Sequence, residues 1–294
     1  MKKFFAAVLS LAMVMSFAAC GKKKAQSGSA GSGTTAAAAG SSGKTASTRK
    51  PNPAEKYVKH KIEKITIPGY ADEDGEIIEN EEIEFHMPEI QIKSSYTESI
   101  NKEVTTSLND CRAVILKEGT TDYGGSEYLA YLYKNEILSI VFIVLGPNDT
   151  DIFHVYNIDV KTGEKVDNAR IAQIAGVSNI RQTAMDALQA YYNQSDNYKI
   201  ENYKVIREGG DLTDEEVQEV EGSFGEKYLN DNMMIGLNDE GKIFFISEME
   251  TEAGSFFNMY DVKGNDLSGE DNPARYGYVY EGGDGDEGED GGDE

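Results

Sequence analysis

The clearest periodicity of hydrophobic positions in the chain predicts a helix near residue 100. Apolar residues recur there at spacings of four, four, three and four, which is the period of one helical face. They are Ile100, Val104, Leu108, Cys111 and Ile115. Ser95 and Glu98 have the spacing of a capping box before this face, and Gly119 can end the helix after it. We therefore expect an amphipathic helix in which the Cys111 thiol packs as a small hydrophobe.

Apolar runs between residues 126 and 160 predict three neighbouring strands. Residues 126–134 and 137–145 flank Asn135 and Glu136 as in a β-hairpin, and residues 152–160 follow after a short loop. The second run is apolar on both faces, which is typical of a central strand covered on both sides. These runs predict an antiparallel meander with a buried middle strand.

A second meander and two further helices are predicted in the C-terminal half. Strand-like runs cover residues 233–237, 242–248 and 256–262, while residues 180–191 show helical periodicity and Thr213-x-x-Glu216 has the form of a capping box. Because strands and helices occur in separate runs, the predicted fold class is α+β. We expect antiparallel sheet meanders packed with helices, in one domain of two sub-lobes.

The N-terminus has the layout of a secretory leader. Residues 1–19 begin with Met1-Lys2-Lys3 and continue into an apolar run that is shorter than the roughly 20 residues of a spanning helix. Phe17-Ala18-Ala19-Cys20 resembles the lipobox of bacterial lipoproteins, with Phe17 in a place where leucine is usual. The resemblance implies a lipidated Cys20 that anchors the mature protein to the outer face of the cell membrane. Two alternatives stay open, namely a retained membrane anchor and a disulfide between Cys20 and Cys111.

Composition separates two low-complexity ends from a folded middle. Residues 20–54 are rich in Gly, Ser, Ala and Thr, which predicts a flexible tether. Residues 281–294 contain only Gly, Asp and Glu, which predicts a disordered acidic tail. Residues 55–280 remain for the α+β envelope domain. The formal net charge of -24 makes nucleic acid an unexpected partner, because phosphate binding requires a basic face.

Four short motifs in the folded part resemble a bacterial envelope domain of largely unknown function. They are Met87-Pro88-Glu89-Ile90, Ser99-Ile100-Asn101, Asn135-x-Ile137-Leu138-Ser139-Ile140, and Tyr156 to Gly163-Glu164. That domain is similar to the lysozyme-binding ectodomain of the sigma-V anti-sigma factor and to the N-terminal region of peptidoglycan deacetylase C. The resemblance implies the fold and an extracytoplasmic role. It transfers no binding residue, because this chain departs from the family pattern in the loop that follows Gly146.

No catalytic or metal-binding constellation can be recognised in the sequence. The histidines His60, His86 and His154 are far apart in the sequence, and they lack the spacing of metal ligands. His154 alternates with apolar positions, as a packed structural histidine would. Residues 70–81 match part of an EF-hand loop but have Tyr70 in place of the first ligand, which favours a solvated turn. Glycine-rich segments of the tether lack the flanking strand and helix of nucleotide-binding motifs. We expect no enzymatic activity, no cofactor and no metal site.

Three classes of function stay open at this point. The first is a membrane-anchored extracytoplasmic lipoprotein that acts as a binding or sensing module for a basic protein, such as a lysozyme-like wall hydrolase, or for a cell-wall component. The alternatives are a cell-wall glycan hydrolase and a calcium-binding structural envelope protein. Tyr131 and Tyr133 share a strand face with Leu129, which suits either core packing or a contact surface. The sequence does not identify the binding face.

Overall fold

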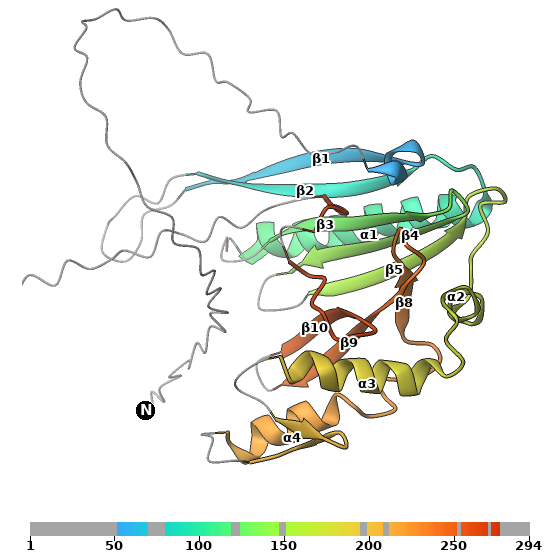
Figure 1. Ribbon diagram of the computed structural model, residues 1–294. Helices are drawn as coiled ribbons and strands as arrows, with labels where there is room; N and C mark the ends of the chain where they lie inside the picture. Colours follow the sequence, from blue (N-terminus) through green and yellow to red (C-terminus); the bar gives the residue numbers. More distant parts are fainter. Residues whose placement is uncertain are drawn as a thin grey trace, which may run out of the picture. The chain divides into compact units, whose positions relative to one another are not determined.

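The larger sheet, sheet 1, is built around the predicted meander. The computed structural model describes residues 52–69, 80–118, 124–146, 151–194, 199–207, 212–251, 254–269 and 272–276. The strands of sheet 1 are β1 (Val58–Ile67), β2 (Glu81–Ile90), β3 (Gly125–Tyr133), β4 (Ile137–Leu145), β5 (Ile152–Asp159) and β11 (Arg275–Tyr276). They lie in the order β1 to β5, and β11 pairs with β3 (Figure 1). The β3–β4 and β4–β5 pairs are antiparallel, which confirms the meander.

A hairpin that the sequence pattern did not predict extends sheet 1. Strands β1 and β2 pair along their full length in antiparallel register, and β2 continues the sheet by a parallel bridge from Phe85 to Ser126. Strand β1 is therefore an edge strand. Its lysines, including Lys59, Lys61 and Lys64, are the kind of residue that discourages edge-to-edge association.

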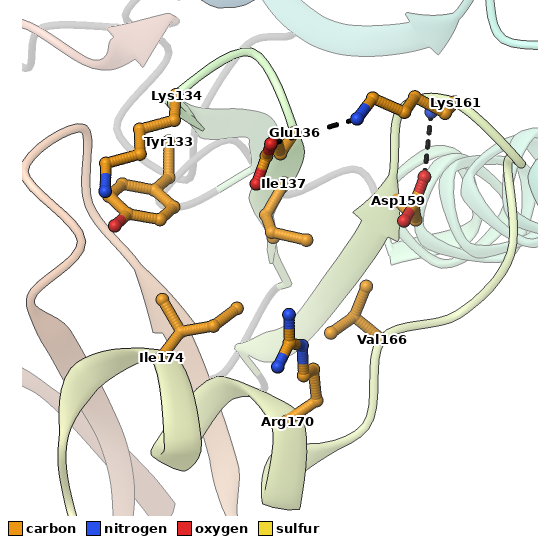
Figure 2. A pocket seen from close by; sticks show the side chains of 9 residues that line it. All are labelled: Tyr133, Lys134, Glu136, Ile137, Asp159, Lys161, Val166, Arg170 and Ile174. Carbon is orange, nitrogen blue, oxygen red and sulfur yellow. Dashed lines mark hydrogen bonds and ion pairs between the residues drawn. The ribbon is translucent and has the colours of Figure 1, made fainter.

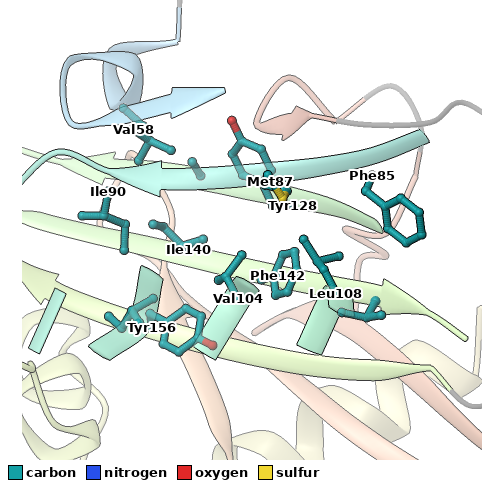
Figure 3. Close-up of a cluster of buried hydrophobic side chains, with 14 of the residues drawn as sticks. Val58, Phe85, Met87, Ile90, Val104, Leu108, Tyr128, Ile140, Phe142 and Tyr156 are labelled. Atoms are coloured by element: carbon teal, nitrogen blue, oxygen red, sulfur yellow. The ribbon is translucent and has the colours of Figure 1, made fainter. Parts of the chain in front are cut away.

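Helix α1 (Ser95–Glu118) covers one face of sheet 1 and packs against β2 and β4. All five residues of the predicted helical face are buried, with at most 8% of their surface exposed. They enter one core together with side chains of sheet 1 (Figure 3). Burial of each large aliphatic side chain contributes about 1.5–3 kcal/mol relative to exposure, so this face is enough to fix the helix on the sheet.

The start of α1 differs from the prediction by one residue. The Thr97 N–H donates to Ser94 Oγ at 3.1 Å, and the Ser94 N–H donates to Thr97 Oγ1 at 3.1 Å. Ser94 is therefore the capping residue, and the predicted capping box of Ser95 and Glu98 is wrong. A hydrogen bond of 2.6 Å from the Ser94 hydroxyl to the Gly163 carbonyl also holds Ser94 in this place.

The second predicted meander is also present and forms a separate sheet, sheet 2. Its strands are β8 (Met234–Leu237), β9 (Ile243–Thr251) and β10 (Gly254–Asp261), in the order β10-β9-β8. The other elements of this half are α2 (Asn168–Ala175), α3 (Ile180–Tyr192), β6 (Ile200–Glu201), β7 (Lys204–Val205) and α4 (Asp214–Gly222). The capping box of α4 is confirmed, because Thr213 and Glu216 exchange hydrogen bonds. The eight residues of α2 were not predicted, since so short a helix shows little periodicity.

Sheets 1 and 2 share a hydrophobic cluster and a buried polar network. The cluster includes Val141 from β4 and Phe244 from β9. In the network, the Ser139 hydroxyl donates to Asn157 Oδ1 at 2.6 Å, and Asn157 Nδ2 donates to the Ile235 carbonyl at 2.8 Å. Strand β8 pairs with β9 along one edge, and on its other edge the Ile235 carbonyl and the Leu237 N–H are bound by the side chains of Asn157 and Ser139 instead of by a strand. The α+β fold class is confirmed.

The described fold begins before the expected boundary at Glu55. A single turn of 3-10 helix, η1 (Pro53–Lys56), follows Asn52, and both Asn52 and Ala54 are buried. Asn52 Nδ2 donates to the Ala130 carbonyl of β3 at 2.9 Å. Residues 52–54, which the sequence assigned to the tether, are therefore part of the folded unit. The predicted acidic tail lies outside the described residues.

Candidate functional site

A cleft of about 500 Å³ opens where the β3–β4 loop, the β5–α2 connection and helix α2 meet (Figure 2). Its lining combines charged, aromatic and aliphatic side chains from these three segments. The lining residues are Tyr133, Lys134, Glu136, Ile137, Asp159, Lys161, Val166, Arg170 and Ile174. Several elements thus contribute to one concave surface, which is the usual form of a ligand site.

The β3–β4 loop is a tight turn that is held in place from outside. Lys134 and Asn135 both have positive φ, +47° and +54°, and the Glu136 N–H donates to the Tyr133 carbonyl at 2.9 Å. Positive φ at both central positions is the geometry of a type I′ hairpin turn. Asn135 Oδ1 accepts hydrogen bonds from Lys56 Nζ and the Tyr57 hydroxyl of the η1 region. The loop is therefore fixed to the start of the folded chain.

Tyr133, which forms one wall of the cleft, packs against a glycine in the β8–β9 turn of sheet 2. A Cβ atom at Gly241, in the β8–β9 turn, would lie 2.4 Å from the ring of Tyr133, and Gly241 has φ +76°. Only glycine suits this position on both counts. The sequence left open whether Tyr131 and Tyr133 serve core packing or a contact surface. Tyr131 is buried in the core and its hydroxyl accepts a hydrogen bond from Asn272, whereas Tyr133 is half-buried and lines the cleft.

The β5–α2 connection presents Lys161 to the cleft, and the first turn of α2 presents Arg170. Asp159 Oδ1 accepts hydrogen bonds from the Lys161 and Thr162 N–H groups at 2.8 and 3.1 Å, which is ordinary Asx-turn geometry. Asp167 then caps α2 by accepting from the Arg170 N–H at 2.8 Å. Arg170 is therefore held in the first turn of α2, with its side chain directed into the cleft (Figure 2).

The charges of the cleft are only partly paired. Lys161 Nζ lies 3.8 Å from Glu136 Oε1, and Lys134 Nζ lies 4.8 Å from the centroid of the Tyr133 ring. A hydrogen bond with Tyr133 raises the pKa of Lys134 above its ordinary value, so this lysine is a cation at neutral pH. Within the described ranges, no carboxylate lies within 4 Å of Arg170 or Lys134. The cleft is thus suited to an anionic group, despite the strongly acidic chain.

Two of the histidines, which are 26 residues apart in the sequence, lie beside each other in the structure. His86 Nδ1 lies 3.3 Å from His60 Nε2, and His60 Nδ1 lies 3.1 Å from the Tyr128 hydroxyl. His86 Nε2 lies 3.1 Å from Glu84 Oε2. The cause is the register of β1 and β2, which pairs Ile62 with His86 and so places the two histidines diagonally on one face.

This histidine chain has the character of a structural network. His86 is 7% exposed and Tyr128 is 1% exposed, and Tyr276 stacks on Tyr128 with ring centroids 4.7 Å apart. Burial lowers the pKa of His86, and the Glu84 carboxylate opposes this effect. Tyr128 can donate to His60 and His60 to His86 without any added proton, while His86 Nε2 lies beside the Glu84 carboxylate but does not form a hydrogen bond with it. Such an arrangement fixes the hairpin on β3.

His154 stands apart from this pair. Its Nδ1 lies 3.4 Å from Glu103 Oε1 of α1, and its ring is stacked with that of Tyr156. Burial lowers its pKa below the ordinary value. The half-buried, stacked ring agrees with the expectation of a packed histidine.

Other sites considered from the sequence are only partly covered by the described residues. Cys20 and residues 70–79 of the EF-hand-like segment lie outside them. Cys111 is a free cysteine in the core, where burial raises its thiol pKa. Among the residues with described positions, no three histidine, cysteine or acidic side chains gather as metal ligands, and no helix is both long and apolar enough to cross a membrane.

Residues that carry the envelope-domain resemblance occupy structural positions. Asn101 of α1 donates to the Ile90 carbonyl at 3.0 Å and accepts from the Ile90 N–H at 2.9 Å, so it replaces a strand partner at the end of β2. Ser139 and Asn157 form the network between the sheets. No family model and no curated protein matches the chain. The resemblance stays a prediction: its motifs supply these folding contacts, and Ile137, Asp159 and Lys161 of the last two motifs also line the cleft.

Proposed function

We propose that this chain is a lipid-anchored extracytoplasmic protein that acts as a binding or sensing module. The basis for the anchor is the leader that ends in Phe17-Ala18-Ala19-Cys20 and is followed by a Gly/Ser-rich segment. Stable attachment to a membrane through lipid requires more than one acyl chain. The resemblance to lipoproteins implies that maturation adds at least two acyl chains at Cys20. A folded unit held in this way is exposed to wall components and to secreted proteins.

The observation that carries the binding role is the open cleft at one end of sheet 1. Among the described residues that line it, none is a serine, cysteine, threonine or histidine that could form a nucleophile–base pair. Of its two carboxylates, that of Asp159 accepts two backbone hydrogen bonds and that of Glu136 faces Lys161. Recognition of a ligand therefore accounts for this site better than hydrolysis does.

For the protein partner, we propose a basic extracellular protein, with a lysozyme-like wall hydrolase as the leading candidate. The formal net charge of -24 favours rapid encounter with a cationic protein. Helix α4 adds a local acidic surface, since Asp214, Glu215 and Glu216 all lie in its first turn. The domain that the chain resembles occurs in a lysozyme-binding ectodomain, which supports the same partner. The cleft itself is cationic. A basic partner would therefore bind an acidic face of this chain outside the cleft.

Calorimetric titration of the purified protein with lysozyme tests this partner. The matched control is cytochrome c, another small basic protein, and both titrations are repeated as salt is raised from 0.1 M to 1 M, where the Debye length falls from about 10 to about 3 Å. A specific complex should persist with lysozyme at raised salt, while any heat from cytochrome c should vanish. Equal behaviour of the two proteins, or no heat with lysozyme even at low salt, would remove the proposed partner.

A further inference from the structure

In the cleft, the side chain of one arginine lies beside a wall of aliphatic side chains. Arg170 projects from the first turn of α2 toward the middle of the cleft, where Ile137, Val166 and Ile174 line the wall (Figure 2). Ile137 and Val166 are buried, with 6% and 7% of their surface exposed, so they are fixed parts of the core that show one face to the cleft. A ligand group beside Arg170 would thus have an apolar surface next to it.

The guanidinium of Arg170 is available for an anion. Its Nη1 donates to Gln173 Oε1 at 2.6 Å, which is a neutral acceptor on the same helix. As noted above, no carboxylate of the described residues lies within 4 Å of it. A guanidinium presents paired donors whose spacing matches the two oxygens of a carboxylate, and such bidentate pairs are stronger than neutral hydrogen bonds.

The balance of charges favours a monoanion. The lining contains three cations, Lys134, Lys161 and Arg170, and two acids, Glu136 and Asp159, which leaves a formal charge of 3 - 2 = +1. One carboxylate neutralises this excess. A phosphate, which carries more than one negative charge near neutral pH, would be held close to the two acids.

We infer that the cleft binds the C-terminal end of a short peptide. The carboxylate of the peptide lies on Arg170, and its last side chain, which is apolar, lies on Ile137, Val166 and Ile174. The inference rests on the proposed function only for the source of the peptide, because an extracytoplasmic protein meets the stem peptides of the wall. The recognition chemistry depends on the cleft alone.

Two peptides that differ in a single group test the inference. The full-length protein is titrated by calorimetry with N-acetyl-alanyl-alanyl-valine that has either a free C-terminal carboxylate or a C-terminal amide, at low salt and neutral pH. We expect the acid to bind at least tenfold more tightly than the amide. Inorganic phosphate is then titrated as a competitor and should displace the acid only at much higher concentration.

Variants assign the effect to Arg170. Arg170→Gln should weaken binding of the acid at least tenfold and leave binding of the amide unchanged, and Arg170→Lys should lie between Arg170→Gln and the wild type. The matched control is Arg207→Gln, which removes the same charge from another exposed arginine, one that pairs with Asp214. Arg170 is exposed, so each variant should fold, and a thermal melt checks this.

Several outcomes would overturn the inference. They are equal affinity for acid and amide, no binding of either peptide, an equal loss in Arg207→Gln, or displacement by phosphate at the concentration of the peptide. The lysozyme titration of Arg170→Gln should match that of the wild type. A failure of the peptide site is therefore distinguishable from a failure of the proposed protein partner.

Discussion

Removal of one partner from the buried ion pair between Glu127 and Arg275 should destabilise the fold strongly. Glu127 lies on β3 and Arg275 on β11, and their side chains are only 7% and 12% exposed. Glu127→Ala leaves the guanidinium buried without this carboxylate, which costs about 3–5 kcal/mol in comparable buried pairs. We expect the lower end, about 3 kcal/mol, because the guanidinium keeps a hydrogen bond to the Ser268 carbonyl.

Urea unfolding at constant m-value measures this change in the free energy of unfolding. The Tm should fall by roughly 6–12 °C, since 1 kcal/mol corresponds to about 2–4 °C in a domain of this size. Two controls separate the cost of an unpaired charge from the worth of the pair. The double substitution Glu127→Leu with Arg275→Met should recover most of the loss. Glu250→Ala, in the exposed pair with Lys227, should change stability by less than about 1 kcal/mol. A loss below about 1 kcal/mol in Glu127→Ala would refute the reasoning.

Three further predictions concern the core and its titration. Asn157→Ala leaves buried partners of the network between the sheets without hydrogen bonds and should cost about 1–3 kcal/mol in urea unfolding; a neutral result would contradict that role. Gly163→Ala should cost about 1–3 kcal/mol, because φ is +73° and the new Cβ would lie 2.7 Å from the Cβ of Ser94; a stabilised variant would contradict the geometry. Burial lowers the pKa of His86 and of His154, so the unfolded state binds their protons first, and stability should fall as pH drops below about 6.5. The free energy of unfolding should fall by at most about 1.4 kcal/mol per pH unit for each histidine. Its dependence on pH should be weaker in the His86→Gln, His154→Gln double variant, and an unchanged slope in that variant would contradict the prediction.

Where local pattern decides structure, the sequence was a sufficient guide. The apolar face of α1, the buried strand β4 and both meanders follow from periodicities of 3.6 and 2 that hold over many residues. The capping box of α1 failed because Ser94, Ser95 and Thr97 are chemically similar candidates, and the choice between them depends on the contact of Ser94 with Gly163, which lies 69 residues away.

Long-range pairing explains what was not predicted. His60 and His86 come together through the register of β1 and β2, and β11 is too short to carry a pattern of its own. The cleft draws its residues from a turn, a connection and a short helix, each of which is ordinary in isolation. A partial signal existed: the hairpin turn before β4 and the Asx turn at Asp159 after β5 must lie at the same end of an antiparallel meander, where loop residues can converge.

Display of the protein on the outer face of the membrane by Cys20 is the claim on which the proposed protein partner and the proposed source of the peptide both depend. Mass spectrometry of the mature N-terminus from the membrane fraction tests it most directly, with Cys20→Ala as the control. We predict that the first residue is a lipid-modified Cys20 and that Cys20→Ala is either released from the membrane or retains residues 1–19. A mature chain that begins elsewhere, or an unmodified Cys20 in a protein that still fractionates with the membrane, would contradict the account.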